Sequence, residues 1–204
     1  MLHIGIMGGT FDPIHLGHIQ LAEQALNEAH LDRILFMPNH TPWMKRGRGV
    51  LDIEHRLNMV RLGIEDHPSF ELSLVEIEAA GDSYTYQTLE ALKKDYPKNT
   101  QLYFIVGADS LFNMEDWVHP ELILQNAVIL AAVRDGHDKD ALNKQKERLL
   151  NLFGGEIRLL SMEQVDISST RIREEFYRSK SVKEMLPKKV AEYITKNHLY
   201  QNEA

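Results

Sequence analysis

Two histidines stand three residues apart, directly after a glycine-rich turn. His15 and His18 close the segment Gly8–His18, which follows a short apolar run, Leu2–Met7. Side chains three residues apart at a helix start share one face, so both imidazoles can reach one ligand. Adjacent glycines let the backbone approach that ligand, and the N–H groups of a helix N-terminus favour phosphate. The segment therefore predicts a phosphate site in which two imidazoles stabilise charge on the phosphate oxygens.

The spacing of the glycines excludes two common nucleotide motifs. Gly5, Gly8 and Gly9 do not form GxGxxG, and no Gly-Lys-Ser or Gly-Lys-Thr follows them. No suitable acidic residue ends the second predicted strand, so a Rossmann oxidoreductase is disfavoured as well. The histidine spacing would also suit a metal ion, but Asp12 is the one carboxylate nearby and does not complete a ligand set. We expect no protein-ligated metal here.

A second group of candidates begins at residue 168. Ser168 or Ser169 is a natural N-cap, and Thr170 and Arg173 follow within the next turn. Hydroxyls, unpaired N–H groups and a guanidinium at one helix end form an anion site. A capped helix with surface arginines is the alternative interpretation of the same residues.

The composition is that of a globular protein without a nucleic-acid-binding character. The chain has 204 residues, of which 43% are hydrophobic and 26% charged, with a formal net charge of -7. An acidic balance argues against DNA or RNA as a partner, although a local cationic cluster can still hold a small anion. Cysteine is absent, and neither a signal peptide nor a membrane span is evident. We expect a soluble, cytoplasmic protein with no membrane partner.

The elements that must position these residues alternate along the chain. Strands are predicted over Leu2–Met7, Arg33–Met37, Phe70–Ile77, Gln101–Val106, Ala127–Val133 and Glu156–Leu160. Helices are predicted over His15–Ala29, Asp52–Glu65, Ser83–Asp95, Pro120–Leu124 and Lys139–Leu152, and in Ser169–Asn197 with breaks near Ser181 and Pro187. This alternation predicts an α/β fold: a Rossmann-like, doubly wound, mainly parallel sheet with C-terminal helices, in one domain over residues 1–204. Ligands then bind beyond the strands' carboxyl ends, at the turns after Met7, Met37, Val106 or Val133.

The first segment resembles the signature of the HxGH nucleotidyltransferase superfamily. His15, Gly17 and His18 match its defining positions. In that superfamily both histidines contact the triphosphate, and the second is the main catalytic residue. The resemblance implies that the preceding residues also bind the ATP phosphates, namely Gly8, Gly9, Thr10 and Phe11.

The later helix start resembles the second signature of the same superfamily. Ser168, Ser169, Thr170 and Arg173 match positions that hold the ATP phosphates. The resemblance implies that Arg173 shares in catalysis by stabilising the leaving pyrophosphate.

The acceptor is indicated by other features. The run Asp82–Thr88, the run Gly107–Ser110 and the downstream Trp117 together resemble the bacterial nicotinate mononucleotide adenylyltransferases. The resemblance extends from Gly8 to Tyr200. It implies that the pyridine ring of the acceptor stacks on Trp117.

The same resemblance implies four further acceptor-binding residues. Thr85 would help hold the carboxylate, and Asp109 would lie near the ribose. Lys45 would contact phosphate, and Arg134 would also bind the acceptor. The loop before Lys45 departs from the family pattern, because Trp43-Met44 stands where many relatives carry Pro-His.

The resemblance implies transfer of the adenylyl group of ATP to nicotinate mononucleotide, with Mg²⁺ bridging the triphosphate. Two alternatives stay open. One is an adenylyltransferase for another acceptor, such as phosphopantetheine or nicotinamide mononucleotide. The other is a nucleotide-binding module without catalysis. The oligomeric state cannot be read from the sequence, and a homodimer is compatible with it.

Overall fold

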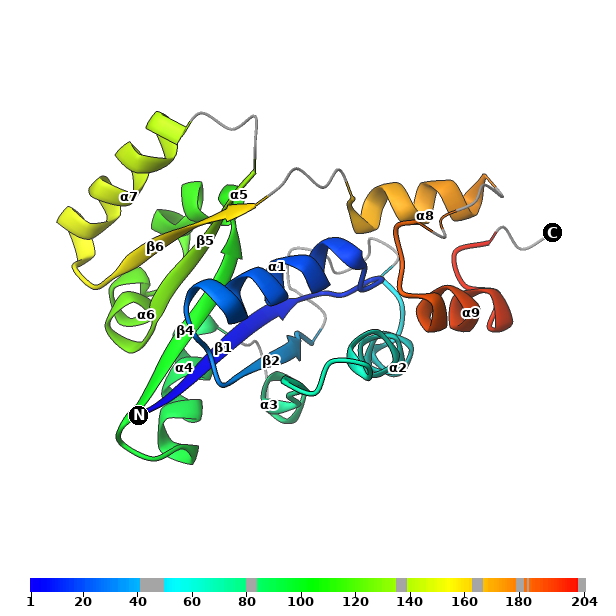
Figure 1. Ribbon diagram of the computed structural model, residues 1–204, viewed down its shortest axis with the longest axis horizontal. Coiled ribbons are helices and arrows are strands. Elements are labelled where there is room, and N and C mark those ends of the chain that lie inside the picture. The colour runs from blue at the N-terminus through cyan, green and yellow to red at the C-terminus, as the bar shows by residue number, and fades with distance from the viewer. Residues whose placement is uncertain are drawn as a thin grey trace.

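The computed structural model describes residues 1–40, 50–79, 84–134, 139–162, 167–178, 182 and 184–201, without the side chains of Arg134 and Met162. The strands are β1 (Leu2–Gly9), β2 (Arg33–Pro38), β3 (Phe70–Leu72), β4 (Thr100–Gly107), β5 (Val128–Arg134) and β6 (Ile157–Met162). They form one six-stranded sheet in the order β3-β2-β1-β4-β5-β6, and every neighbouring pair is parallel (Figure 1). The predicted Rossmann-like sheet is confirmed.

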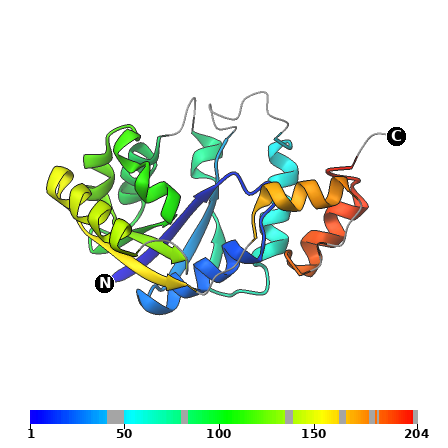
Figure 2. The ribbon, with the colours of Figure 1, turned by 90° about the horizontal axis from the view of Figure 1, so that it is seen from above.

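Helices connect the strands across both faces of this sheet. They are α1 (Leu16–Glu28), α2 (Ile53–Ile64), α3 (Val75–Glu78), α4 (Thr85–Asp95), α5 (Ala108–Phe112), the 3-10 helix η2 (Met114–Asp116), α6 (Pro120–Asn126), α7 (Lys139–Phe153), α8 (Ser169–Tyr177) and α9 (Lys188–Lys196). Figure 2 shows α8 and α9 beside α2 at one end, with α7 at the other. Within the described ranges, none of these helices has the length and apolarity needed to span a bilayer.

Two apolar cores hold the helices against the sheet. One contains side chains of α1, α2, α8 and α9, such as Ala22, Met59 and Ile172. The other contains side chains of α4 to α7, such as Leu89 and Leu142. Successive residues of a central strand enter opposite cores, as Leu102 and Tyr103 of β4 do, because successive strand side chains point to opposite faces.

The order of the strands determines where a ligand can bind. From β1 the chain proceeds to β2 on one side, and it later returns to place β4 on the other side of β1. At such a reversal the connecting segments leave a crevice at the carboxyl ends of the two strands. The crevice lies between the turn after β1 and the turn after β4, two of the four turns predicted to bind a ligand.

One predicted strand was too long. Residues 70–77 were expected to form it, but β3 ends at Leu72, and Val75–Glu78 is the short helix α3. Ser73 donates its N–H to Phe36, and the chain then leaves the sheet edge. The alternation of Val75 and Ile77 with glutamates imitates a strand. However, the Glu76 side chain is buried and accepts a hydrogen bond from Thr88 of α4, a contact between distant residues that period-two reasoning does not detect.

Candidate active site

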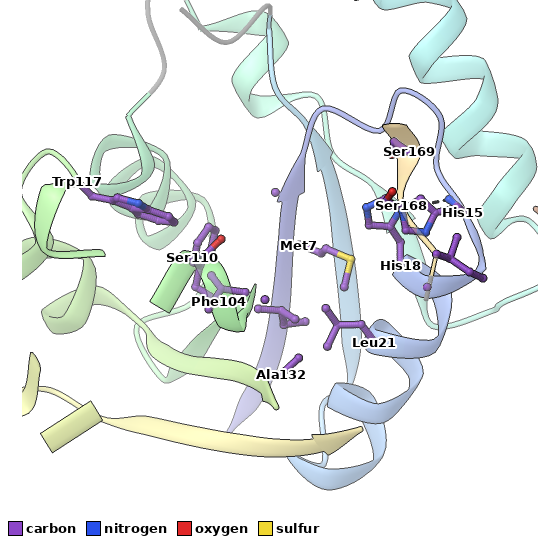
Figure 3. A pocket seen from close by; sticks show the side chains of 16 residues that line it. Met7, His15, His18, Leu21, Phe104, Ser110, Trp117, Ala132, Ser168 and Ser169 are labelled. Carbon is purple, nitrogen blue, oxygen red and sulfur yellow. Dashed lines mark hydrogen bonds between the residues drawn. The ribbon is translucent and has the colours of Figure 1, made fainter. Parts of the chain in front are cut away.

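A cavity of about 290 Å³ lies at the carboxyl ends of β1 and β4. Figure 3 shows His15, His18, Ser168 and Ser169 on one side of it and Trp117, Phe104 and Ser110 on the other, with Met7 between them. The lining includes six of the residues predicted from sequence: Gly8, His15, His18, Trp117, Ser168 and Ser169. The fold thus joins the two predicted phosphate segments and places an aromatic residue opposite them.

The two histidines form a stacked pair at the start of α1. Their ring centroids are 3.7 Å apart with an angle of 25° between the planes. His15 is 7% exposed and is the N-cap of the helix, whereas His18 is half-buried. The Phe11 ring forms a T-shaped contact with His18, at 5.1 Å between centroids. These contacts fix the orientation of the His18 ring before any ligand arrives.

A backbone hydrogen bond assigns the proton on His18. The N–H of His15 donates to His18 Nδ1 at 3.2 Å. Because a backbone N–H can only donate, Nδ1 must be the acceptor, and a neutral His18 ring carries its proton on Nε2. The ring therefore offers an N–H donor at Nε2, which is what stabilising a phosphate oxygen requires.

Gly17 allows the imidazole pair to pack this closely. A Cβ built on Gly17 would lie 3.1 Å from Nδ1 and 3.2 Å from Cε1 of His15. Those distances are shorter than ordinary van der Waals contact, and the His15 ring has little room to move because His18 stacks on it. The glycine between the histidines thus has a steric reason in this structure.

We expect Gly17→Ala to reduce turnover about tenfold without loss of folded stability. The new methyl group displaces the His15 imidazole, while alanine in place of a helical glycine favours the helix by about 1 kcal/mol. Steady-state turnover and a thermal melt measure the two effects. Gln20→Ala, on the exposed side of α1, is the matched control. Unchanged turnover in Gly17→Ala would contradict the steric role.

The residues before the histidines differ in what they can offer a ligand. Gly8 is exposed and lines the cavity, whereas Gly9 faces the Phe11 ring, which a Cβ would approach to 3.1 Å. Phe11 is 2% exposed and also packs on Phe36, so its side chain is not open to a ligand. The carbonyl of Thr10 accepts a hydrogen bond from a buried arginine, Arg56.

The start of α8 is joined directly to the turn that precedes α1. Ser168 is the N-cap, and its Oγ accepts from the N–H of Arg171 at 3.2 Å. Ser169 donates its hydroxyl to the Pro13 carbonyl at 3.0 Å, and Arg173 donates to the Asp12 carbonyl at 2.7 Å. The two predicted phosphate segments, about 160 residues apart, are therefore held in one rigid arrangement by hydrogen bonds.

Two predicted members of this group lie beside the cavity rather than in its lining. The Thr170 side chain is exposed and accepts from Arg173 at 3.3 Å. Arg173 is half-buried, and its guanidinium has five N–H donors. The bonds to Thr170 and to the Asp12 carbonyl use two of these donors, so others can contact a phosphate.

Arg56 of α2 is a buried charged residue. It is 1% exposed, and its guanidinium donates to the carbonyls of Leu51, Thr10 and Asn39 at 3.1, 2.9 and 2.9 Å. Burial lowers the pKa of the guanidinium, and the nearby Asp12 charge opposes that effect. Arg56 connects the turns after β1 and β2 to the start of α2.

The other end of the cavity is aromatic. Trp117 follows η2, and its ring meets Phe104 of β4 edge to face, at 6.1 Å and 80°. The hydroxyl-bearing Ser110 of α5 also lines this end, in the run Gly107–Ser110 that drew attention in the sequence, although Ser110 itself was not selected. The helix α5 was not predicted, because its five residues are too few to show a helical period.

Two further acceptor candidates that the structure describes, Thr85 and Asp109, are not in the cavity lining. Thr85 begins α4, and Asp109 is exposed near the start of α5. Lys45, like the Trp43-Met44 pair, and the side chain of Arg134 lie outside the described residues. Their roles stay predictions.

Among the described residues, the side chains that could ligate a metal are scattered. Across the parts of the chain that the structure describes, no three histidine, aspartate or glutamate side chains gather in one place. The described lining of the cavity offers imidazoles and hydroxyls but no carboxylate, whereas Mg²⁺ is usually bound by one or two carboxylates together with substrate phosphates. The residues present fit a cation that arrives with a triphosphate.

Comparison with known proteins agrees with this geometry. The model of the cytidylyltransferase-like family matches residues 6–175. A probable nicotinate-nucleotide adenylyltransferase of Lachnoclostridium phytofermentans is 40% identical over 98% of this chain and 100% of its own. Another, from Clostridium tetani, is 38% identical over 96% and 98%.

A solved structure shares the fold. The Plasmodium falciparum nicotinic acid mononucleotide adenylyltransferase complexed with NaAD superposes with a TM-score of 0.79 at 20% identity, covering 98% of both chains. The match to the family model and the 38–40% identity to the two bacterial proteins establish that the chain belongs to the cytidylyltransferase-like family and, within it, to the nicotinate-nucleotide adenylyltransferases.

Proposed function

We propose that this protein transfers the adenylyl group of ATP to the 5′-phosphate of nicotinate mononucleotide, forming nicotinic acid adenine dinucleotide and pyrophosphate. The observation that carries the proposal is the cavity itself: a stacked histidine pair stands at one end and Trp117 at the other. Phosphates and a flat heterocycle are the two parts that such a cavity accommodates. The curated relatives of similar length carry the name of this activity.

The chemistry is an in-line displacement at the α-phosphorus. An oxygen of the acceptor phosphate forms the new P–O bond, the bond between the α-phosphorus and the bridging oxygen breaks, and pyrophosphate leaves with that electron pair. The nucleophile is already ionised near neutral pH, so no strong general base is needed. Catalysis then depends on positioning and on charge stabilisation.

The histidine pair and the start of α8 divide these tasks. His18, with its proton on Nε2, donates to the phosphate oxygens as their charge rises, and His15 supports it. Ser168, Ser169 and Thr170 at the N-terminus of α8, together with Arg173, hold the departing pyrophosphate. Mg²⁺, bound to the triphosphate, would supply further charge neutralisation.

The acceptor occupies the aromatic end in this proposal. Its pyridine ring stacks on Trp117, and Thr85 and Asp109 bind the carboxylate and the ribose. Lys45 contacts phosphate, and Arg134 also binds the acceptor.

A substrate panel tests the proposed reaction. Pyrophosphate release is measured with ATP and Mg²⁺ in the presence of nicotinate mononucleotide, nicotinamide mononucleotide or phosphopantetheine. We expect the largest kcat/KM with nicotinate mononucleotide. Release with phosphopantetheine alone would refute the choice of acceptor, and ATP binding without release in any arm would favour a non-catalytic module.

We expect Trp117→Ala to raise the KM for nicotinate mononucleotide about tenfold, since a base–aromatic stack contributes roughly 1–3 kcal/mol. The KM for ATP should change less than twofold, because the residues assigned to the triphosphate lie across the cavity. Trp117→Phe, which keeps a stacking face, is the control. Equal changes in both KM values would argue against acceptor stacking.

A further inference from the structure

The last described turn of the chain reaches back to the phosphate-binding segment. The hydroxyl of Tyr200 donates to the Asp12 carboxylate at 2.6 Å, across 188 positions of sequence. Asp12 is 3% exposed and lies within the segment Gly8–His18. Burial, and next the adjacent carboxylate, raise the pKa of the Tyr200 phenol, so it keeps its proton and remains a donor at neutral pH. A buried carboxylate depends on such donors.

The backbone around Tyr200 is shaped for this contact. His198 and Tyr200 both have left-handed conformations, with φ of 53° and 59°. Such conformations cost free energy for residues with a side chain and persist where the surroundings enforce them. Here Leu199 is buried in the core formed with α1, α2, α8 and α9, and the Tyr200 ring packs against Phe176 of α8 at 6.2 Å. His198 and Tyr200 thus both adopt unfavourable backbone conformations close to the hydrogen bond between the Tyr200 hydroxyl and Asp12.

A second contact from the same C-terminal region holds the other end of the segment. The carbonyl of Met185, between α8 and α9, accepts the N–H of Leu16, the first residue of α1, at 2.9 Å. Figure 1 shows α8 and α9 at the end of the sheet where α1 begins. The bonds from Tyr200 and Met185 therefore bracket His15, one of the two imidazoles of the site.

The turn from Thr10 to Pro13, called the Asp12 turn below, also accepts hydrogen bonds from α8. Arg173 donates to the backbone carbonyl of Asp12, and Ser169 donates to that of Pro13. Arg56 donates to Thr10, two residues earlier, and its charge lies near the Asp12 carboxylate. A displaced Asp12 would therefore shift Arg173 and Ser169 as well as the approach to His15.

We propose that Tyr200 is a positioning residue for the triphosphate: its hydroxyl holds Asp12, and through Asp12 it keeps the histidine pair and Arg173 in register with each other. This inference deepens the proposed function and rests on it. Tyr200 lies at the edge of the region bearing the phosphate-binding candidates, so the consequence of losing its hydroxyl should fall on ATP rather than on the acceptor.

Tyr200→Phe removes the hydroxyl and keeps the ring. We expect kcat/KM for ATP to fall about tenfold, with the KM for nicotinate mononucleotide unchanged within twofold, since misplacement of catalytic groups without new contacts lowers rate steeply. Tyr193→Phe is the matched control. Its hydroxyl also joins distant helices, accepting from Asn58 at 3.2 Å and lying 3.0 Å from His55 Nδ1, but it does not touch the Asp12 turn. Equal kinetic losses in the two variants would overturn the proposal.

A double-mutant cycle separates action through Asp12 from general destabilisation. Asp12→Ala removes both oxygens that can accept from the Tyr200 hydroxyl. If Tyr200 acts through Asp12, adding Tyr200→Phe to Asp12→Ala should cost less than a further twofold in kcat/KM for ATP. Multiplicative losses would mean that the two residues act independently and would reject the proposed route.

The affinity for ATP alone distinguishes this inference from the proposed function. Calorimetric titration with Mg²⁺ and ATP, without acceptor, should give a Kd about fivefold or more weaker for Tyr200→Phe than for wild type and Tyr193→Phe. An unchanged Kd together with unchanged kcat/KM would refute the Tyr200 role even if nicotinate mononucleotide is the substrate. If nicotinate mononucleotide proves inactive with wild type, the proposed acceptor fails, and this ATP comparison still tests Tyr200.

Discussion

His18→Ala is expected to lower kcat about 10²- to 10³-fold, the effect of removing one preorganised donor from a developing oxyanion. The His18 ring is oriented by three contacts: the N–H of His15 on Nδ1, the stacked His15 ring and the Phe11 ring. Because all three exist before a ligand binds, the Nε2–H donor needs little reorganisation in the transition state. Loss of such a donor should affect kcat more than the KM for either substrate.

Folding should survive this substitution. His18 is half-buried, and its removal leaves the His15 N–H without one neutral acceptor, a cost of about 1 kcal/mol. Single-turnover pyrophosphate release measures the chemical step, and circular dichroism checks the fold. His67→Ala is the control, since His67 stacks on Phe70 and pairs with Glu23, and it does not line the cavity. If His18→Ala retains more than a third of the wild-type kcat, His18 is not a catalytic residue.

Arg56→Met is expected to destabilise the fold by about 3–5 kcal/mol, the cost of leaving a buried charge and its acceptors without their partner. Methionine fills much of the volume but donates no hydrogen bond. Carbonyls of Leu51, Thr10 and Asn39 would lose their donor, and the buried Asp12 would lose a nearby positive charge. For a chain of this size the loss corresponds to a fall in Tm of roughly 6–20 °C.

Urea denaturation and a thermal melt measure that loss. Arg61→Met on the same helix is the control, because Arg61 is exposed and its one described hydrogen bond is to Asn58. Arg56→Lys should fall between wild type and Arg56→Met, since lysine keeps the charge but not the planar fork that reaches several carbonyls. A Tm for Arg56→Met within 2 °C of wild type would show that these buried bonds contribute little.

The features that the sequence analysis identified are local. The histidine pair, its glycine and the N-cap at Ser168 lie within a few residues of one another, and the strand–helix alternation repeats over short windows. Local spacing determines which side chains share a helix face and which element follows which. The sequence by itself therefore determined the parallel α/β fold, the two phosphate-binding candidates and, by resemblance, the family.

Only the tertiary structure determines which side chains form hydrogen bonds with the Asp12 turn. Arg56 and Tyr200 lie 44 and 188 positions from Asp12, and neither belongs to a periodic pattern that marks it as buried or bonded. A polar residue's burial depends on what the fold packs around it, and hydrogen bonds across such separations leave no trace in local spacing. Ser169 shows what each level determines. The sequence predicted its place at a helix start, but only the tertiary structure shows that its hydroxyl donates to the Pro13 carbonyl and so joins the two halves of the site.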